Sequence, residues 1–252
     1  MNEITLMSDP RIAAIPVQEC GEPLVDVRSD GALLVDPRKT DPEGAFAHLR
    51  RGVLQRLVTA QDLLPDGLRL LFVERYRPLS LQRRYFEEYA AELRTAHPDW
   101  STAQIHAAAS RYVSPPDIAP HSAGAAVDLT LVDAHGHELD LGTRLNASPE
   151  ESQGACYTGA DNITAEAREN REILNTAMMA AGLVNYPTEW WHWYYGDRYQ
   201  IHSQCIGLQP GGEANLVVAT RSVAESWSAE LDIVCSPSVA RSAAMGDPGG
   251  AG

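Results

Sequence analysis

A carboxylate inside an apolar run is the feature that most constrains this chain. Residues 125–133 read Ala-Ala-Val-Asp-Leu-Thr-Leu-Val-Asp, which is typical of a buried strand, and Asp128 lies in its middle. A buried carboxylate without a partner is costly, so Asp128 requires hydrogen-bond donors or a metal ion. His121 precedes it by seven residues, and Gly124 between them permits the backbone to fold back so that both side chains converge.

A second stretch, residues 189–193, supplies another histidine with a carboxylate three residues before it. Its aromatic residues predict a strand over 189–195. In a strand, Glu189 and His192 would point to opposite faces, so a bend near the tryptophans is required for both to face one metal. His, Asp and His are suitable ligands for a catalytic zinc that keeps one position open, and Glu189 would remain as general base.

Simpler interpretations exist for each of these residues. A histidine beside tryptophans is commonly a packed core residue, and Asp128 can be a structural carboxylate satisfied by hydrogen bonds. These simpler interpretations are less favoured when the residues are considered together. A buried carboxylate in the middle of a strand needs a partner, and a metal is a natural one. His135 and His137 lie in a polar turn and are expected to be solvated.

Several motifs resemble one known family. His-x-x-Gly-x-Ala-x-Asp at 121–128 resembles the first zinc motif of the D-alanyl-D-alanine dipeptidases of the vancomycin-resistance type, and Glu-Trp-Trp-His at 189–192 resembles the second. The resemblance covers about residues 25–200. Three shorter segments are also similar to segments of that family: Tyr76-Arg77-Pro78, Asp140-Leu141-Gly142-Thr143 and Asn170-Arg171.

The resemblance implies an α+β fold, with a small, mainly antiparallel sheet flanked by helices and a zinc site in a cleft. It implies that Zn²⁺ is held by His121, Asp128 and His192 and that Glu189 is the general base. Arg77 is expected to stabilise the oxyanion of the intermediate. The alternative for Arg77 is a surface or structural ion pair.

Two positions depart from the family pattern. Ala119 stands where the family usually has Ser, and Asn146 where it usually has Asp; in the family both help to hold the dipeptide, and the Asp faces its amino group. Losing that carboxylate removes a charge-assisted hydrogen bond. We therefore expect a zinc peptidase that hydrolyses a small peptide, with altered recognition of D-Ala-D-Ala. The alternatives are a zinc D,D-carboxypeptidase or other small-peptide amidase, and a non-catalytic zinc-binding recognition module, against which Glu189 argues.

The composition of the chain limits the classes of molecule that it is expected to bind. A net charge of −14 argues against nucleic acid and anionic membranes. No window approaches 18 uninterrupted apolar residues, and the N-terminus lacks the features of a signal peptide, so a cytoplasmic protein is expected. The sequence does not specify an oligomeric state. Four dispersed cysteines are expected to be free thiols: Cys20, Cys156, Cys205 and Cys235.

The expected organisation is a catalytic domain over 1–203, a C-terminal extension over 204–235 and a disordered tail over 236–252, which is rich in Ser, Ala, Gly and Pro. Within the extension, 214–220 and 231–235 are expected to be short strands. In the catalytic domain the patterns predict these elements: strands at 33–37, 67–73 and 138–141, and helices at 43–60, 80–96, 102–112 and 164–181, the last capped by Thr164 and Gly182.

Overall fold

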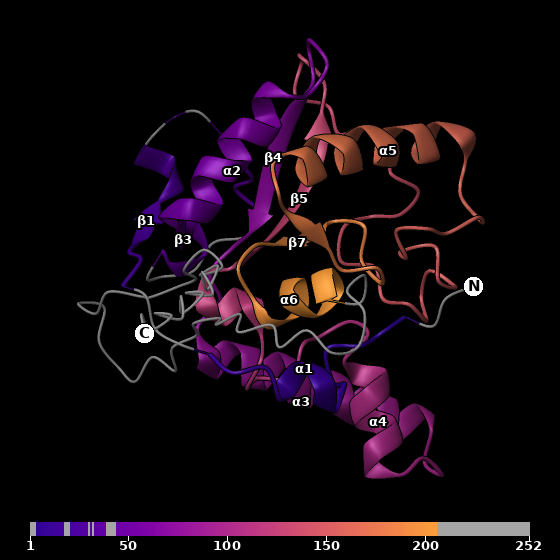
Figure 1. The fold of residues 1–252 in the computed structure, drawn as a ribbon. Helices are drawn as coiled ribbons and strands as arrows, with labels where there is room; N and C mark the ends of the chain where they lie inside the picture. Colours follow the sequence, from indigo (N-terminus) through magenta and orange to yellow (C-terminus); the bar gives the residue numbers. More distant parts are fainter. Residues whose placement is uncertain (1–3, 18–20, 30, 32, 39–43, 206–252) are drawn as a thin grey trace, which may run out of the picture.

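A five-stranded sheet forms the centre of the computed structural model, which describes residues 4–17, 21–29, 31, 33–38 and 44–205 (Figure 1). The strand order is β2-β4-β5-β7-β6; β2 runs parallel to β4, and the other neighbours are antiparallel. The strands span Leu34–Val35 (β2), Arg69–Glu74 (β4), Ala126–Val132 (β5), Val184–Asn185 (β6) and His192–Tyr194 (β7). A mainly antiparallel sheet with flanking helices confirms the predicted α+β class.

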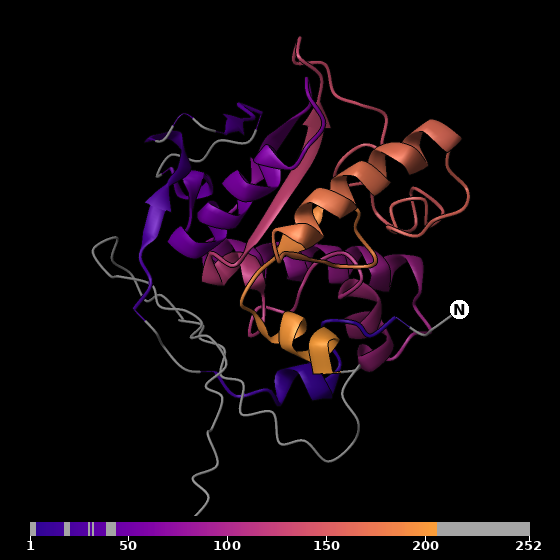
Figure 2. The same ribbon diagram turned by 45° about the horizontal axis from the view of Figure 1, so that its top comes forward.

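Helices pack in pairs around this sheet. The helices α2 (Arg51–Asp62) and α5 (Ala165–Ala180) lie against each other, with β5 beside them in the view of Figure 2. The second pair is α3 (Leu79–Ala96) with α4 (Thr102–Ala109), and the third is α1 (Pro10–Ala13) with α6 (Arg198–Cys205). A separate two-stranded sheet pairs β1 (Leu24–Asp26) with β3 (His48–Arg50), and short 3-10 turns occupy Val27–Ser29 (η1), Ala45–Ala47 (η2) and Pro120–Ala123 (η3).

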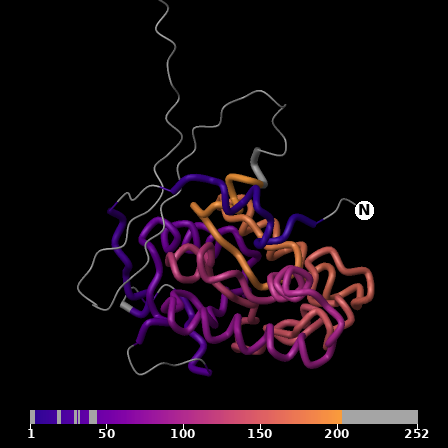
Figure 3. The backbone as a smooth tube through the Cα atoms, turned by 90° about the horizontal axis from the view of Figure 1, so that it is seen from below, coloured from indigo at the N-terminus to yellow at the C-terminus, as the bar shows by residue number. Residues whose placement is uncertain are grey.

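The N-terminal segment lies beside α6, the last helix of the described chain, and is hydrogen-bonded to it (Figure 3). The Tyr199 hydroxyl donates to the Thr5 carbonyl at 2.7 Å, and Arg198 Nε donates to the Ile15 carbonyl at 3.0 Å. These bonds hold α1 against α6, just after the strand that carries His192.

Strand β5 is buried along its whole length. Leu129 and Leu131 join Phe72 and Trp193 in the main core, on the face opposite Asp128. Asp128 and Thr130 are buried with them, at 2% and 1% exposure. The carboxylate of Asp128 is therefore buried deeply enough to require polar partners, as predicted.

Several predicted elements are confirmed. The strand at 67–73 is β4, the helix at 80–96 is α3, and the helix at 102–112 is α4, which ends at Ala109. Thr164 caps α5 by accepting from the Ala167 N–H. Gly182 lies one residue beyond the cap, at φ +83°, and closes the helix together with Leu183 through bonds to the Met179 and Met178 carbonyls.

Two predicted elements are wrong. The helix expected from residue 43 begins only at Arg51, because residues 48–50 pair with β1 and their backbone hydrogen bonds go to that strand. The strand expected at 138–141 is reduced to an isolated bridge between Val132 and Glu138. There the Asp140 carboxylate accepts from the Gly142 N–H at 2.8 Å and turns the chain away from the sheet.

Some predictions concern residues outside the described part of the chain. These are the strands at 214–220 and 231–235, the tail at 236–252, and the state of Cys20 and Cys235. Cys156 is a buried free thiol, as predicted. Among the described residues, no helix is both long and apolar enough to cross a membrane.

Candidate active site

Sheet register aligns three polar residues across neighbouring strands. Asp128 on β5 is opposite Glu74 on β4 and opposite His192 on β7. Directly opposed residues of antiparallel strands share one face of the sheet. The register shifts between Phe72 and Glu74, and this bulge places Glu74, rather than Val73, opposite Asp128.

His121 reaches this face from the loop before β5. It lies on η3, which Gly124 ends in a left-handed conformation at φ +62°. A side chain at Gly124 would also collide with Leu24, so glycine is required both by conformation and by close approach. The turn predicted between His121 and Asp128 is thus confirmed, and the two side chains converge.

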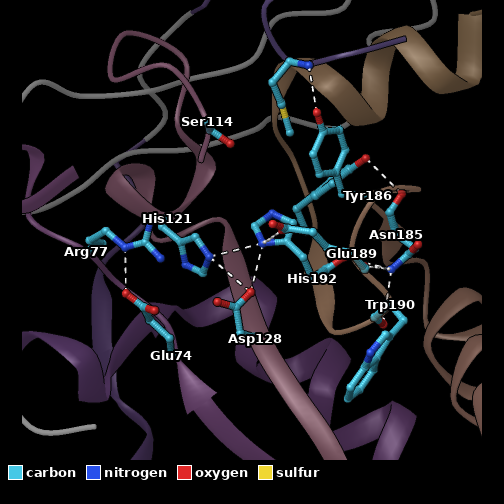
Figure 4. Close-up of polar contacts among 12 residues, drawn as sticks. Glu74, Arg77, Ser114, His121, Asp128, Asn185, Tyr186, Glu189, Trp190 and His192 are labelled. Carbon is cyan, nitrogen blue, oxygen red and sulfur yellow. Dashed lines mark hydrogen bonds and ion pairs between the residues drawn. The ribbon is translucent and has the colours of Figure 1, made fainter. Parts of the chain in front are cut away.

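The donor atoms of His121, Asp128 and His192 form a compact triangle (Figure 4). His121 Nε2 lies 3.2 Å from His192 Nδ1 and 3.3 Å from Asp128 Oδ1, and His192 Nδ1 lies 2.9 Å from Asp128 Oδ1. Ligands bound to zinc at about 2.0–2.1 Å in a tetrahedron are about 3.3 Å apart. The triangle therefore has the donor types and nearly the edge lengths of three zinc ligands, and it can hold a metal ion.

Neighbouring groups set the protonation of these three side chains. His121 Nδ1 lies 2.5 Å from the Arg75 carbonyl, which can only accept a hydrogen bond, so Nδ1 carries the proton and Nε2 presents a lone pair. Burial raises the pKa of Asp128, but its contacts with His121, and then with His192, outweigh this effect and hold the pKa well below its usual value. Burial lowers the pKa of His192. An ionised carboxylate and neutral imidazoles are the states that bind metals.

Glu189 lies beside the triangle because the chain bends before β7. Glu189 Oε2 is 3.7 Å from His192 Nδ1. The Glu189 N–H bonds to the Tyr186 carbonyl at 2.9 Å and the His192 N–H to the Glu189 carbonyl at 3.2 Å, which forms the predicted bend. Strand β7 consequently begins at His192, three residues later than the strand predicted from the aromatic run.

Arg77 lies just beyond β4 and faces the same cleft. Its Nε donates to Glu74 Oε1 at 2.6 Å, and its Nη1 donates to Gln82 Oε1 at 2.8 Å. Burial lowers the pKa of Arg77, but the charge of Glu74 outweighs it and raises this pKa above its ordinary value, so Arg77 stays charged. The structural ion pair anticipated as an alternative thus exists, and it holds Arg77 at the cleft.

The cleft has a volume of about 420 Å³. Its floor carries His121, Asp128, Glu189 and His192, and Trp191 lies beside them. The walls come mainly from α3 and the loops after α4 and β5: Tyr85, Glu88, Tyr89, Glu92, Tyr112, Arg144 and Asn146.

The two positions that depart from the family pattern differ in placement. Asn146 lines the cleft, and its backbone is held at φ 61° by bonds from the Tyr112 hydroxyl and Arg144 Nη1 to its carbonyl. Asparagine tolerates this left-handed conformation. Ala119 is 4% exposed and is not among the residues that line the cleft; its carbonyl accepts from the Ser122 N–H.

Arg171 organises the loop that carries Asn146. From α5, this buried side chain donates to the carbonyls of Leu141 at 2.8 Å, Tyr157 at 2.6 Å and Ala155 at 2.7 Å, and so ties both ends of the loop together. The resemblance to the family includes Arg171 without giving it a role, and Glu74 and Gln82 lie outside the motifs that carry the resemblance. A charged residue on the buried face of a predicted helix is the signal that points to Arg171.

His135 and His137 take no part in the site. They lie in the turn after β5 and are exposed, and His137 Nδ1 lies 3.2 Å from Asp133. This agrees with the expectation that both are solvated.

A buried His-Asp-His triangle with a carboxylate beside it in a cleft is an arrangement that suits a metal-dependent hydrolase. A family model described as D-ala-D-ala dipeptidase matches residues 45–210. The D-alanyl-D-alanine dipeptidase of Synechocystis sp. is 31% identical over 216 residues, which cover 73% of this chain and 86% of that protein. That of Escherichia coli is 33% identical over 128 residues, which cover 50% of this chain and 55% of that protein.

The chain therefore belongs to the D-ala-D-ala dipeptidase family and is a peptidase. Among solved structures, the LdcB LD-carboxypeptidase is similar with a TM-score of 0.43 and 16% identity, covering 83% of this chain and 88% of that one.

We predict that Arg171→Met lowers the free energy of unfolding by about 2–4 kcal/mol, because three buried loop carbonyls lose their donor. Arg168→Met is the matched control on the same helix, since Arg168 is exposed and donates one bond, to the Ile163 carbonyl. Its effect should stay within about 0.5 kcal/mol. Urea denaturation measures both free energies of unfolding. Equal effects would contradict the conclusion that Arg171 holds the two ends of the loop together.

Proposed function

We propose that this chain is a zinc-dependent peptidase that hydrolyses a small peptide of the D-Ala-D-Ala type, with altered recognition of its amino end. The zinc ligands are His121, Asp128 and His192. The observation that carries the proposal is the triangle of donor atoms, 2.9–3.3 Å on each edge, with Glu189 at 3.7 Å from one of them. The names of the curated relatives support the substrate class.

Zinc held by these residues supplies a Lewis acid that activates water and polarises the scissile carbonyl. Glu189 acts as general base: its carboxylate accepts the proton of the attacking water and returns it to the leaving amine as the C–N bond breaks. Its place at the edge of the triangle, 6% exposed, supports this role. Arg77 donates to the carbonyl oxygen as negative charge develops there, since it is a fixed cation on the cleft wall.

A second candidate within the enzymes is a zinc D,D-carboxypeptidase or another small-peptide amidase. The cleft leaves room for such a substrate, because about 420 Å³ falls in the range of sites that take ligands larger than a dipeptide. A non-catalytic zinc-binding module is disfavoured, since such a module has no need of a carboxylate where Glu189 lies. The cytoplasmic location stays a prediction, as do the boundaries of the C-terminal extension.

The proposal is tested by screening the zinc-loaded protein against D,D-, L,D- and L,L-dipeptides and short peptides. We expect hydrolysis of at least one D,D-substrate, and Glu189→Gln should lower kcat by about 10²–10⁴-fold while zinc is retained, because an amide cannot accept the proton. His121→Ala should lose zinc and activity together. Hydrolysis by Glu189→Gln at the wild-type rate would exclude Glu189 as the base, and a wild type that binds no zinc and cleaves nothing would contradict the proposal.

A further prediction concerns Asn146. Asn146→Asp keeps the shape and tolerates the left-handed backbone, and it restores a carboxylate on the cleft wall. Such a charge-assisted bond contributes about 1.5–3 kcal/mol, so kcat/KM for free D-Ala-D-Ala should rise by about one to two decades relative to its N-acetylated form. Asn162→Asp, which adds the same charge at an exposed position outside the cleft, should leave this ratio unchanged. An unchanged ratio in Asn146→Asp would show that another residue recognises the amino group.

A further inference from the structure

Gln82 connects Arg77 to the loop that leads to His121. Its Oε1 accepts from Arg77 Nη1 at 2.8 Å, and its Nε2 donates to the Ser114 carbonyl at 2.7 Å. The side chain lies on the first turn of α3, is 0% exposed and does not line the cleft. Gln82 therefore acts on the site only through the groups that it holds.

The chemistry of both partners calls for an amide at this position. An arginine only donates hydrogen bonds and a backbone carbonyl only accepts them, so the residue between must offer one acceptor and one donor. A carboxylate could not donate to Ser114, and an apolar side chain would leave both partners without this bond. The amide also adds no charge beside Glu74, which already neutralises Arg77 from the other side.

Two of the three guanidinium nitrogens of Arg77 are occupied by this arrangement. Nε is held by Glu74 and Nη1 by Gln82. Among the described residues, Nη2 has no hydrogen-bond partner, and Arg77 lines the cleft together with His121 and Asp128. Figure 4 shows the guanidinium turned toward His121. The two bonds thus fix the plane of the guanidinium and direct its remaining edge into the cleft.

We propose that Gln82 is a positioning residue for catalysis: it holds the Arg77 guanidinium in the plane from which Nη2 donates to the oxyanion. This inference rests on the proposed function. A donor that is already oriented when negative charge develops stabilises the transition state without reorganisation, whereas one that must first be oriented stabilises it less. The effect of Gln82 should therefore appear in kcat, because the substrate carbonyl carries little charge before the reaction.

The test is Gln82→Met in the zinc-loaded full chain, with the D,D-dipeptide that wild type cleaves fastest. We expect kcat to fall about ten- to a hundredfold, less than loss of an oxyanion donor itself, with KM changed by less than about threefold. A phosphinate analogue of that dipeptide should bind more weakly by the factor lost in kcat/KM. Where Gln82→Met does not fold, Gln82→Asn serves, since it is one methylene too short to reach both partners.

Gln61→Met is the matched control. Gln61 on α2 makes the same pair of bonds, accepting from the Leu70 N–H at 2.8 Å and donating to the Leu68 carbonyl at 3.2 Å, but it lies outside the cleft. It should lower thermal stability and leave kcat within about twofold. A fall in kcat equal to that of Gln82→Met would show that loss of any such bridge produces the effect, and would overturn the inference.

A double-mutant cycle separates positioning from a merely structural role. In an Arg77→Met background, Gln82→Met should change kcat by less than about twofold, because the group that it orients is gone. Additive losses would mean that Gln82 acts on the loop before His121 instead, and would overturn the inference, as would an unchanged kcat in Gln82→Met alone. Absence of turnover by wild type would instead overturn the proposed function, and this inference with it.

Discussion

The carboxylate of Asp128 lies in the middle of a strand that is buried along its whole length, and the rest of the site is arranged around its charge. It is 2% exposed, yet its pKa is held well below the usual value. An ionised carboxylate without partners at such depth would be strongly unfavourable. The imidazoles of His121 and His192 lie 3.3 and 2.9 Å from one of its oxygens, and a divalent cation in the same triangle would supply the compensating charge that neutral imidazoles lack. Stability and metal binding are in this way linked through one residue.

Strand pairing in the central sheet positions the polar side chains of the site. Antiparallel pairing sets His192 opposite Asp128, and the bulge after Phe72 sets Glu74 on the other side. Glu74 then fixes Arg77, and Gln82 joins Arg77 to the chain segment that ends at His121. The proposed metal ligands, general base and oxyanion donor therefore lie on strands or on turns next to them, which suits a site that needs its groups fixed before the substrate arrives. The cleft wall with Asn146 comes instead from a loop, and Arg171 compensates by tying the ends of that loop.

Much of this arrangement could be predicted from sequence because the relevant signals are local. Apolar runs predict β4 and β5, and cap residues predict the ends of α5. The spacing of His121, Gly124 and Asp128 predicts the turn that brings the two proposed ligands together. The sequence predicts that the chain must bend near Glu189, but it does not give the residue at which the bend occurs. That residue depends on where β7 begins to pair with β5 and β6. Long-range pairing explains one wrong prediction, because residues 48–50 form a strand beside β1. The other has a local cause: a turn at Asp140 ends the strand predicted at 138–141. Arg171 and Gln82 act through carbonyls of distant loops, and sequence spacing contains no information on such contacts.

We propose above that His121, Asp128 and His192 together bind one zinc ion. A crystal structure of the zinc-loaded protein, with diffraction data on both sides of the zinc absorption edge, tests it most directly. We expect one anomalous peak per chain, within about 2.0–2.2 Å of His121 Nε2, His192 Nδ1 and an Asp128 oxygen, with the fourth position open toward Glu189 and the cleft. A peak at other residues, or none at this triangle with zinc present in excess, would contradict it.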